Sequence, residues 1–239
     1  MLDPAALRAR LDSVRERIAD AARRVGRDPA GICLVAISKT FPIETIRVAA
    51  AAGQRDFGEN KIQEALPKIE GSHDLEATWH FVGHLQSNKA RKAAQRFDVI
   101  HSVDNADLAL RLDAAAREAG RTVQLLIQVD LAGEATKHGT PEEALPDILL
   151  AAAACRSARV AGLMLLPPAV DEPEGARPYF KELVALRDRL VARGADPSML
   201  MELSMGMSHD FEVAVEEGAT MVRVGSAIFG SRPLRSVDL

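Results

Sequence analysis

The sequence predicts an α/β fold, a single (β/α)8 barrel of the TIM type. Eight short apolar runs typical of buried strands alternate with helical patterns along the 239 residues. Parallel strands that are joined by right-handed helical crossovers close into a barrel at this strand number. The chain has the length of one α/β barrel, and neither a linker nor a low-complexity tract marks a second domain. A doubly wound open sheet is the alternative, although no strand is followed by a GxGxxG turn.

We therefore expect one domain over residues 1–239, with an extra helix over residues 1–26 before the barrel. Asp3 is a candidate N-cap, with Pro4 at the first helical position. Apolar residues recur at helical spacing and mark one buried face. They are Leu7, Leu11, Val14, Ile18 and Val25.

The remaining elements follow in regular alternation. The predicted strands cover residues 34–39, 56–58, 78–82, 99–101, 123–129, 160–166, 199–203 and 221–224. The predicted helices lie near residues 42–52, 61–69, 89–96, 104–120, 141–155, 179–193 and 210–217, with a short turn from 226. Asp104 and Ser208 are candidate caps of two of these helices.

Composition excludes several classes of function. The net charge of -4 gives no general attraction to nucleic acid or to an anionic membrane. Two cysteines, Cys33 and Cys155, form neither a disulfide framework nor a CxxC metal motif, which favours a reducing compartment. No apolar run approaches the length of a membrane span. Acidic residues in the Arg-rich N-terminal helix argue against a transit peptide, so we expect a cytoplasmic protein.

The first strand leads into a lysine, Lys39. A charged amine at the end of a buried strand is usually paired with an acidic group or takes part in a reaction. The alternative is that its ammonium group simply extends into water. Partial burial lowers the pKa of a lysine and exposes the neutral amine that attacks a carbonyl to form a Schiff base. Lys39 is therefore our candidate for covalent chemistry.

Other reactive side chains follow the predicted strands of the same barrel. Glu59 and Asn60 come after the second strand, and His84 comes after the third. Because the carboxyl ends of barrel strands share one face, these side chains should meet Lys39 there. The convergence indicates a functional site at this mouth.

The last two loops predict a phosphate-binding site. Small residues let backbone N–H groups approach an anion at a helix N-terminus, although ordinary helix capping would use the same residues. The first of these loops contains Ser204, Gly206 and Ser208, and the second contains Gly225 and Ser226. Barrels often hold phosphate with the loops after strands seven and eight.

Arg223 lies within the eighth strand between two valines. Its guanidinium either faces a ligand or an acid inside the barrel, or bridges to an outer helix. His80 and His84 span a strand end without an HExxH pattern, so we expect no metal site. The methionines between residues 199 and 207 are expected to fill the core. The basic run over residues 89–96 is interpreted as a solvated helix face.

A lysine that faces a phosphate site suits pyridoxal 5′-phosphate (PLP), an aldehyde that carries a phosphate. The sequence resembles the YggS/PROSC family, the pyridoxal phosphate homeostasis proteins. The resemblance is carried by the blocks VAISKT, FGENKIQEA, WHFVGHLQSNK, GLM and LSMGMSHDFEVAVEEGATMVRVGSAIFG, which together are highly specific and cover nearly the whole chain. It implies a barrel like the N-terminal domain of alanine racemase.

The resemblance also implies roles for individual residues. Lys39 would form the internal aldimine with PLP, and Arg223 would face the pyridine nitrogen. Asn60 and His84 would line the pocket. The phosphate would be surrounded by Ser204, Met205, Gly206, Gly225 and Ser226. The chain departs from the family pattern at Phe41, where a lysine is usual, and at Ser226, where a threonine is common.

Three functions are compatible with these residues. The first is a PLP-binding protein that serves intracellular vitamin B6 balance without strong catalytic activity. The second is a PLP-dependent amino-acid racemase, and the third is a cofactor-free, aldolase-type lyase. We favour the first, because an arginine at the ring nitrogen disfavours protonation of that nitrogen and weakens the ring as an electron sink. The only tyrosine, Tyr179, heads a helix behind a Pro-rich loop and is poorly placed as a racemase's second acid/base group.

The expected partners follow from this choice. PLP is the expected ligand, and PLP-dependent apo-enzymes are the candidate recipients. We expect no nucleic-acid or membrane partner, no catalytic residue and a monomeric chain.

Overall fold

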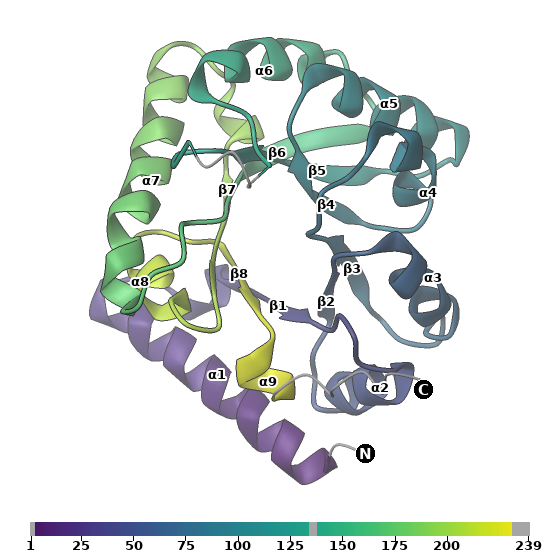
Figure 1. Cartoon of the computed structure of the whole chain (residues 1–239), viewed down its shortest axis with the longest axis vertical. Helices are drawn as coiled ribbons and strands as arrows, with labels where there is room; N and C mark the ends of the chain where they lie inside the picture. The colour runs from purple at the N-terminus through teal and green to yellow at the C-terminus, as the bar shows by residue number, and fades with distance from the viewer. Residues whose placement is uncertain (1–2, 134–137, 231–239) are drawn as a thin grey trace, which may run out of the picture.

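The computed structural model describes residues 3–133 and 138–230. Within these residues, eight parallel strands form a closed barrel in sequence order, and the last strand pairs with the first. The strands are β1 Cys33–Ile37, β2 Asp56–Glu59, β3 Thr78–Phe81, β4 Val99–Val103, β5 Val123–Val129, β6 Ala158–Leu165, β7 Glu202–Met207 and β8 Met221–Val224. Figure 1 shows the barrel end-on. The predicted (β/α)8 barrel is confirmed.

Helices cover the outside of the barrel (Figure 1). They are α1 Pro4–Arg24, α2 Ile43–Ala51, α3 Ile62–Glu70, α4 Ala90–Ala94, α5 Ala106–Glu118, α6 Leu145–Ala153, α7 Arg177–Ala192, α8 Phe211–Glu216 and α9 Ser226–Phe229. Among the described residues, no helix is both long enough and apolar enough to pass through a bilayer.

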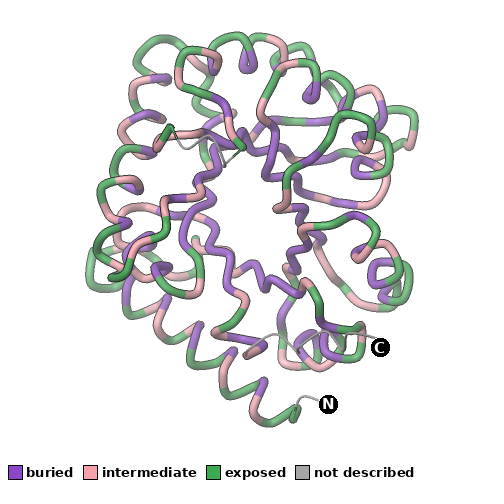
Figure 2. Tube along the Cα trace, viewed as in Figure 1, coloured by how far each residue is buried: buried purple, intermediate pink, exposed green. Residues whose placement is uncertain are grey.

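The main hydrophobic core lies between the barrel wall and the helices. Figure 2 shows buried residues along the wall and on the inner faces of the helices, while exposed residues lie outside. Phe57, Phe180 and Phe211 are fully buried in this layer. A second, small cluster of Leu126, Met164 and Met221 is separate from it. Met221 shares a strand face with Arg223 two residues later, so this second cluster belongs to the barrel interior.

The extra helix α1 forms as predicted. The Asp3 side chain accepts a hydrogen bond from the backbone N–H of Ala5 over 3.1 Å, and Pro4 occupies the first turn. The predicted apolar face is buried up to Ile18. Val25 was expected on that face but is 46% exposed, because it is the C-cap and lies past the last helical turn.

α1 packs across the outside of α2, α8 and α9 (Figure 1). The Arg17 guanidinium pairs with Glu212 on α8 at 2.7 Å and lies over the Phe211 ring. Farther along, Arg24 pairs with Glu216 at 2.8 Å. α1 therefore covers the part of the barrel from which the last two loops emerge.

The seventh strand differs most from the prediction. It was expected over 199–203 but runs from Glu202 to Met207. Ser204-Met205-Gly206-Met207 contains no β-branched residue and therefore suggests a loop. These residues nevertheless pair with β8, with a register shift between Ser204 and Met207. Pairing with the neighbouring strand therefore makes these residues a strand, although their local propensity does not favour one.

Two predicted helix caps are also wrong. The N-cap of α5 is Asn105, whose side chain accepts from the Leu108 N–H at 2.8 Å, and not Asp104. The N-cap of α8 is Asp210 rather than Ser208, and it makes no side-chain capping bond within that helix. Ser208 is used elsewhere, as described below.

Candidate functional site

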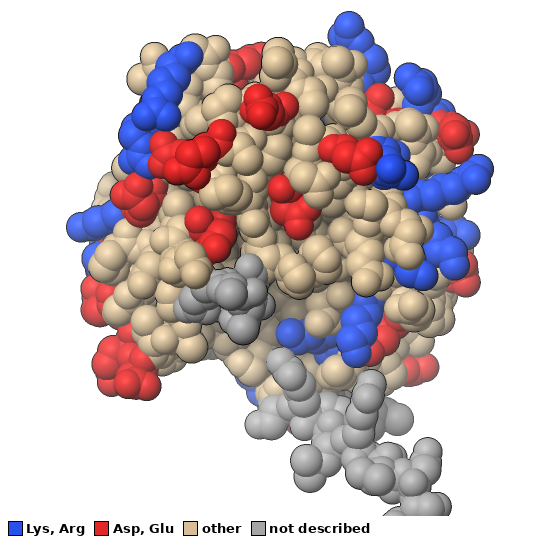
Figure 3. Space-filling model, turned by 45° about the horizontal axis from the view of Figure 1, so that its top comes forward, with Lys and Arg blue, Asp and Glu red and all other residues tan. Residues whose placement is uncertain are grey.

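A cavity of about 540 Å³ opens at the carboxyl ends of the strands. It is lined by six of the nine residues that the sequence assigned to the cofactor: Lys39, Asn60, His84, Arg223, Gly225 and Ser226. Figure 3 shows a hollow in the surface that Lys and Arg side chains border on one side. The loops of a (β/α)8 barrel carry the functional groups at this end. The structure brings these six residues together at one cavity.

Lys39 lies in a tight turn two residues beyond β1. The Phe41 N–H donates to the Ser38 carbonyl at 3.1 Å, and the Ser38 N–H donates to the Gly58 carbonyl at 2.9 Å. Thr40 has a φ of 71°, a left-handed conformation that is strained for a β-branched residue. The turn brings the half-buried Lys39 to the cavity.

A buried ion pair holds this turn from behind. Lys68 Nζ on α3 lies 2.6 Å from Glu59 Oε1 and also donates to the Ser38 carbonyl at 3.0 Å. The Ser38 hydroxyl donates to the same Glu59 oxygen at 2.7 Å. Burial raises the pKa of Glu59, although Lys68 and Ser38 act in the opposite direction. Glu59 was expected among the side chains of the mouth, but it faces α3 instead.

The loops after β7 and β8 meet at Ser208. Its hydroxyl oxygen accepts hydrogen bonds from the backbone N–H groups of Gly225 at 3.0 Å and Ala227 at 3.4 Å. The Asp210 carboxylate accepts from the Met207 N–H at 2.6 Å and fixes the preceding turn. The cavity therefore has a wall of backbone N–H groups and a hydroxyl, which are the groups that bind phosphate.

Three of the nine predicted residues do not line this cavity. Because β7 continues through them, Ser204 and Met205 alternate between the two faces of the strand, and Gly206 lies where the register shifts. Ser204 is buried inside the barrel, and Met205 is buried in the outer hydrophobic core. Gly206 has a φ of 89°, and a Cβ there would lie 2.5 Å from the Ala214 side chain. Gly206 is thus required by the packing of α8.

Arg223 points into the barrel and reaches the floor of the cavity. Its guanidinium donates to the Ser204 hydroxyl oxygen at 2.7 Å and to the Leu165 carbonyl at 2.8 Å. Burial lowers the pKa of Arg223 to about 10, and the charge of Asp210 partly offsets this. The alternative, a salt bridge to an outer helix, is therefore wrong.

A chain of hydrogen bonds runs from Arg223 through the barrel interior. His101 Nδ1 lies 2.9 Å from Ser204 Oγ, His101 Nε2 lies 2.9 Å from His80 Nδ1, and His80 Nε2 lies 3.0 Å from Asp56 Oδ1. Full burial, together with the nearby His80 and Arg223, places the pKa of His101 well below its ordinary value. No local sequence pattern predicts this chain, because its members come from five different strands.

The direction of this chain follows from its acidic end. A carboxylate only accepts, so a neutral His80 carries its proton on Nε2 and accepts at Nδ1. A neutral His101 then donates from Nε2 and accepts the Ser204 hydroxyl proton at Nδ1. Ser204 in turn accepts from Arg223. Every polar atom in the chain is satisfied in this arrangement.

The rim of the cavity carries the predicted Asn60 and His84. The His84 ring stacks on His138 with 3.6 Å between ring centroids. Burial lowers the pKa of His84, His138 lowers it further, and Asp104 has the opposite effect. A Cβ at Gly83 would lie 2.1 Å from the Asn60 carbonyl oxygen, so glycine lets the two loops touch.

The sequence interpretation missed several lining residues. Gln128, His138 and His209 line the cavity although the sequence interpretation named none of them. Met207, which was expected in the core, and Ser208, which was expected in the phosphate loop but not among the cofactor-binding residues, line it too. Gln128 could have been found, because it is a polar residue near the end of an almost wholly apolar strand. His138 and His209 lie in loops whose course local sequence patterns do not predict, and Met207 lies at the end of β7.

Comparison with known proteins gives the family. The family model described as "Alanine racemase, N-terminal domain" matches residues 9–233. A pyridoxal phosphate homeostasis protein of Aquifex aeolicus (strain VF5) is 43% identical over 223 residues, 93% of this chain and 97% of that protein. The one of Escherichia coli (strain K12) is 39% identical over 228 residues, 93% and 95% of the two chains. This chain belongs to the family of pyridoxal phosphate homeostasis proteins.

Solved structures agree with this family. PipY of Synechococcus elongatus PCC7942, solved with PLP bound, is 42% identical with a TM-score of 0.80 and covers 91% of this chain and 100% of its own. An alanine racemase of Clostridium difficile 630 is 14% identical with a TM-score of 0.70 and covers 96% of this chain and 57% of its own. The second likeness shows the barrel fold alone.

Proposed function

We propose that the chain binds PLP in the 540 Å³ cavity and serves intracellular PLP homeostasis rather than strong catalysis. The observation that carries the proposal is the placement of a primary amine, an anion-binding wall and an arginine around one cavity. PLP presents an aldehyde, a phosphate and a ring nitrogen, one for each of these groups. The family name and the PLP-bound PipY structure support the same ligand.

Lys39 is the residue that we assign to the covalent link. PLP supplies an aldehyde that condenses with primary amines. Among the described residues that line the cavity, Lys39 is the lysine. The strained turn and the buried pair behind it fix the backbone from which this amine extends. Fixing the amine in this way favours attack at one defined point of the cavity.

Gly225, Ser226 and Ser208 are the residues that we assign to the phosphate. Gly225 lies at the N-terminus of α9 and, like Ser226, lines the cavity. The backbone N–H groups of Gly225 and Ala227, which are directed at the Ser208 hydroxyl, are donors that an anion can also use. Ser204, Met205 and Gly206 are left out of this assignment, because they do not line the cavity.

Arg223 is assigned to the ring nitrogen. A guanidinium offers N–H donors and no acceptor, so it favours an unprotonated ring nitrogen. An unprotonated ring withdraws fewer electrons and stabilises carbanions poorly. Tyr179 is packed against the outer core and does not line the cavity. Both features favour a protein that holds PLP over a racemase.

We infer that one chain suffices for this site, because all the assigned groups come from one barrel. The single domain over residues 1–239, the monomeric state and the cytoplasmic location are part of the proposal. So is the delivery of PLP to apo-enzymes. The mass of the native protein, measured with and without PLP, tests the monomer directly.

A spectral titration tests the proposed function. Adding PLP to the purified, cofactor-free chain should produce a yellow species at one equivalent per chain. Lys39→Ala should abolish the yellow species, whereas Lys61→Ala, outside this cavity, should keep it. A chain that stays colourless would refute the proposal and leave the cofactor-free lyase. Sustained conversion of L- to D-alanine would instead establish the racemase.

A further inference from the structure

Three donor side chains meet at the opposite end of the barrel from Lys39. Cys33 begins β1, Asp56 begins β2, and His80 lies in β3. Their sulfur, oxygen and nitrogen atoms all lie within 4.8 Å of one another. We propose that Cys33, Asp56 and His80 bind a thiophilic divalent cation, with Zn²⁺ as the best fit. This site is independent of the proposed PLP function.

The donor set matches zinc in type and in spacing. Thiolate sulfur, imidazole nitrogen and carboxylate oxygen are the protein ligands of zinc, at bonds of about 2.0–2.3 Å. In a tetrahedral site such bonds place neighbouring ligand atoms about 3.3–3.8 Å apart. His80 Nε2 and Asp56 Oδ1 are already 3.0 Å apart, and no pair exceeds 4.8 Å. Side-chain adjustments of about an ångström complete the triangle.

Two of the three groups, Asp56 and His80, are already joined by a hydrogen bond that an ion would replace. The Asp56 carboxylate faces both the Cys33 thiol and the His80 ring. Binding of Zn²⁺ would form one bond to each side chain. The thiol proton would leave to solvent, and the His80 ring would keep one proton, now on Nδ1. One proton is therefore released for each ion bound.

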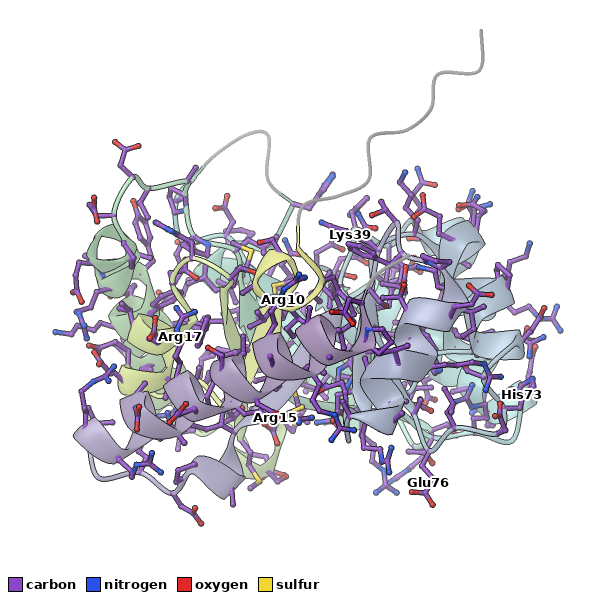
Figure 4. All side chains as sticks on the ribbon, turned by 90° about the horizontal axis from the view of Figure 1, so that it is seen from below. Arg10, Arg15, Arg17, Lys39, His73 and Glu76 are labelled. Carbon is purple, nitrogen blue, oxygen red and sulfur yellow. The ribbon has the colours of Figure 1, made fainter. Side chains whose placement is uncertain are left out.

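The surroundings support the site from outside and from inside. A cavity of about 380 Å³, lined by Cys33, Asp56 and Glu202, gives solvent access and room for a fourth ligand. Arg15 also lines this cavity, but it donates to the Ala52 carbonyl at 3.0 Å. Figure 4 shows Arg15 toward one end of the molecule and Lys39 toward the other. This cavity and the Lys39 cavity share no lining residue.

The inner support is His101, which lies 2.9 Å from His80 Nδ1. Metal-binding histidines are held by a hydrogen bond at their second nitrogen. With an ion on Nε2, His80 donates from Nδ1 to His101, and His101 donates from Nδ1 to Ser204. The ion thus reverses the hydrogen bonds of both rings, up to the hydroxyl that Arg223 contacts.

The experiment uses the purified whole chain, without PLP and after removal of metals. Zinc added in a calorimeter should bind at one ion per chain with release of one proton. Cobalt should produce a thiolate-to-metal charge-transfer band. Cys33→Ser should abolish that band and weaken zinc binding at least about 10- to 100-fold, the loss typical of a disrupted metal site. Cys155→Ser and His73→Gln, which alter residues away from the site, should change neither.

A second measurement uses only the wild-type chain, so it remains informative even when a site variant does not fold. Nitrogen-15 NMR of the intact wild-type chain should show the proton of His80 and of His101 on Nε2 without zinc and on Nδ1 with zinc. Failure of the wild-type chain to bind zinc would overturn the proposal. So would equal loss of binding in Cys33→Ser and Cys155→Ser, or unchanged histidine signals in the zinc-bound chain.

Discussion

Arg223 is a buried, charged residue whose side chain also lines the cavity. Two of its five N–H donors are used by the Ser204 hydroxyl and the Leu165 carbonyl, which fixes the guanidinium in one orientation. A fixed cation can act on a ligand without losing side-chain entropy at binding. The chain through His101 and His80 extends this support across the barrel.

Replacement of Arg223 by glutamate tests the ring-nitrogen assignment. Arg223→Glu should weaken PLP binding by about tenfold or more, which corresponds to about 1.4 kcal/mol, because it removes the donor and adds an acid. The dissociation constant can be measured by spectral titration. Arg111→Glu, an equal change of charge on the exposed face of α5, serves as the control. An unchanged dissociation constant in Arg223→Glu would contradict the placement.

The phosphate assignment is tested at Ser226, which lines the cavity. Ser226→Asp should lower PLP affinity by about tenfold, because a second anion would face the phosphate at a distance where charges interact strongly. Ser226→Ala should have a much smaller effect. Equal affinities in the wild type and Ser226→Asp would place the phosphate elsewhere. Ser204→Asp would not test the phosphate assignment, because the Ser204 hydroxyl lies under Arg223.

At the scale of elements, α3 is joined to the barrel by the Lys68–Glu59 pair. Lys68→Met leaves a buried carboxylate without its cation and should cost about 3–5 kcal/mol of unfolding free energy, measured in urea. Lys61→Met breaks only an exposed pair with Glu64 and should cost less than about 1 kcal/mol.

The pH dependence of Lys68→Met follows from the same pair. Without Lys68 the pKa of Glu59 rises further above its unfolded value, since a cause that lowers it is lost. Protonated Glu59 carries no charge, so the deficit should be smallest at acid pH. It should grow as the pH rises through the folded pKa of Glu59, which in the wild type already lies above the unfolded value of about 4.3. A deficit independent of pH would contradict the buried ion pair.

Asp113 joins α5 to the start of β6. Its carboxylate accepts from the backbone N–H groups of Arg156, Ser157 and Ala158 at 2.8, 2.6 and 2.9 Å. Burial acts to raise the pKa of Asp113, but these three hydrogen bonds outweigh it and the pKa is lowered. Asp113 therefore stabilises the fold above its unfolded pKa of about 3.9, and the contribution is lost as the pH falls through the folded value.

Asp113→Ala should lower the unfolding free energy by about 1–3 kcal/mol at pH 7, because buried N–H groups lose their acceptor. Urea unfolding at neutral and acid pH checks this, and the difference from the wild type should shrink at acid pH. Asp107→Ala, which removes an exposed carboxylate from the same helix, is the matched control. An equal loss in both variants would contradict the role of Asp113.

On the scale of the whole molecule, the sequence predicts what depends on local patterns. The apolar runs predict the strands of the barrel, and the apolar periodicity of the first helix predicts α1. The lysine that follows the first strand predicts the reactive position Lys39. The polar interior could not be predicted, because His80, His101 and Ser204 meet only once strand register is fixed. For the same reason the sequence interpretation put Ser204 and Gly206 at the cavity instead of in β7.

The two ends of the barrel are chemically different but connected. One end presents Lys39 and the loops that carry Ser208 and Gly225, and the other presents Cys33 and Asp56. The cluster of Leu126, Met164 and Met221 fills part of the interior, and the His80–His101 chain crosses the rest. Because the strands form a closed barrel, the two ends keep a fixed position relative to each other.

The central claim is that Lys39 carries the cofactor. The most direct measurement is borohydride reduction of the PLP-loaded chain, followed by mass mapping of the modified peptide. We expect loss of the yellow absorbance and one reduced PLP group per chain, on Lys39. A reduced group on another lysine, or none at all, would contradict it.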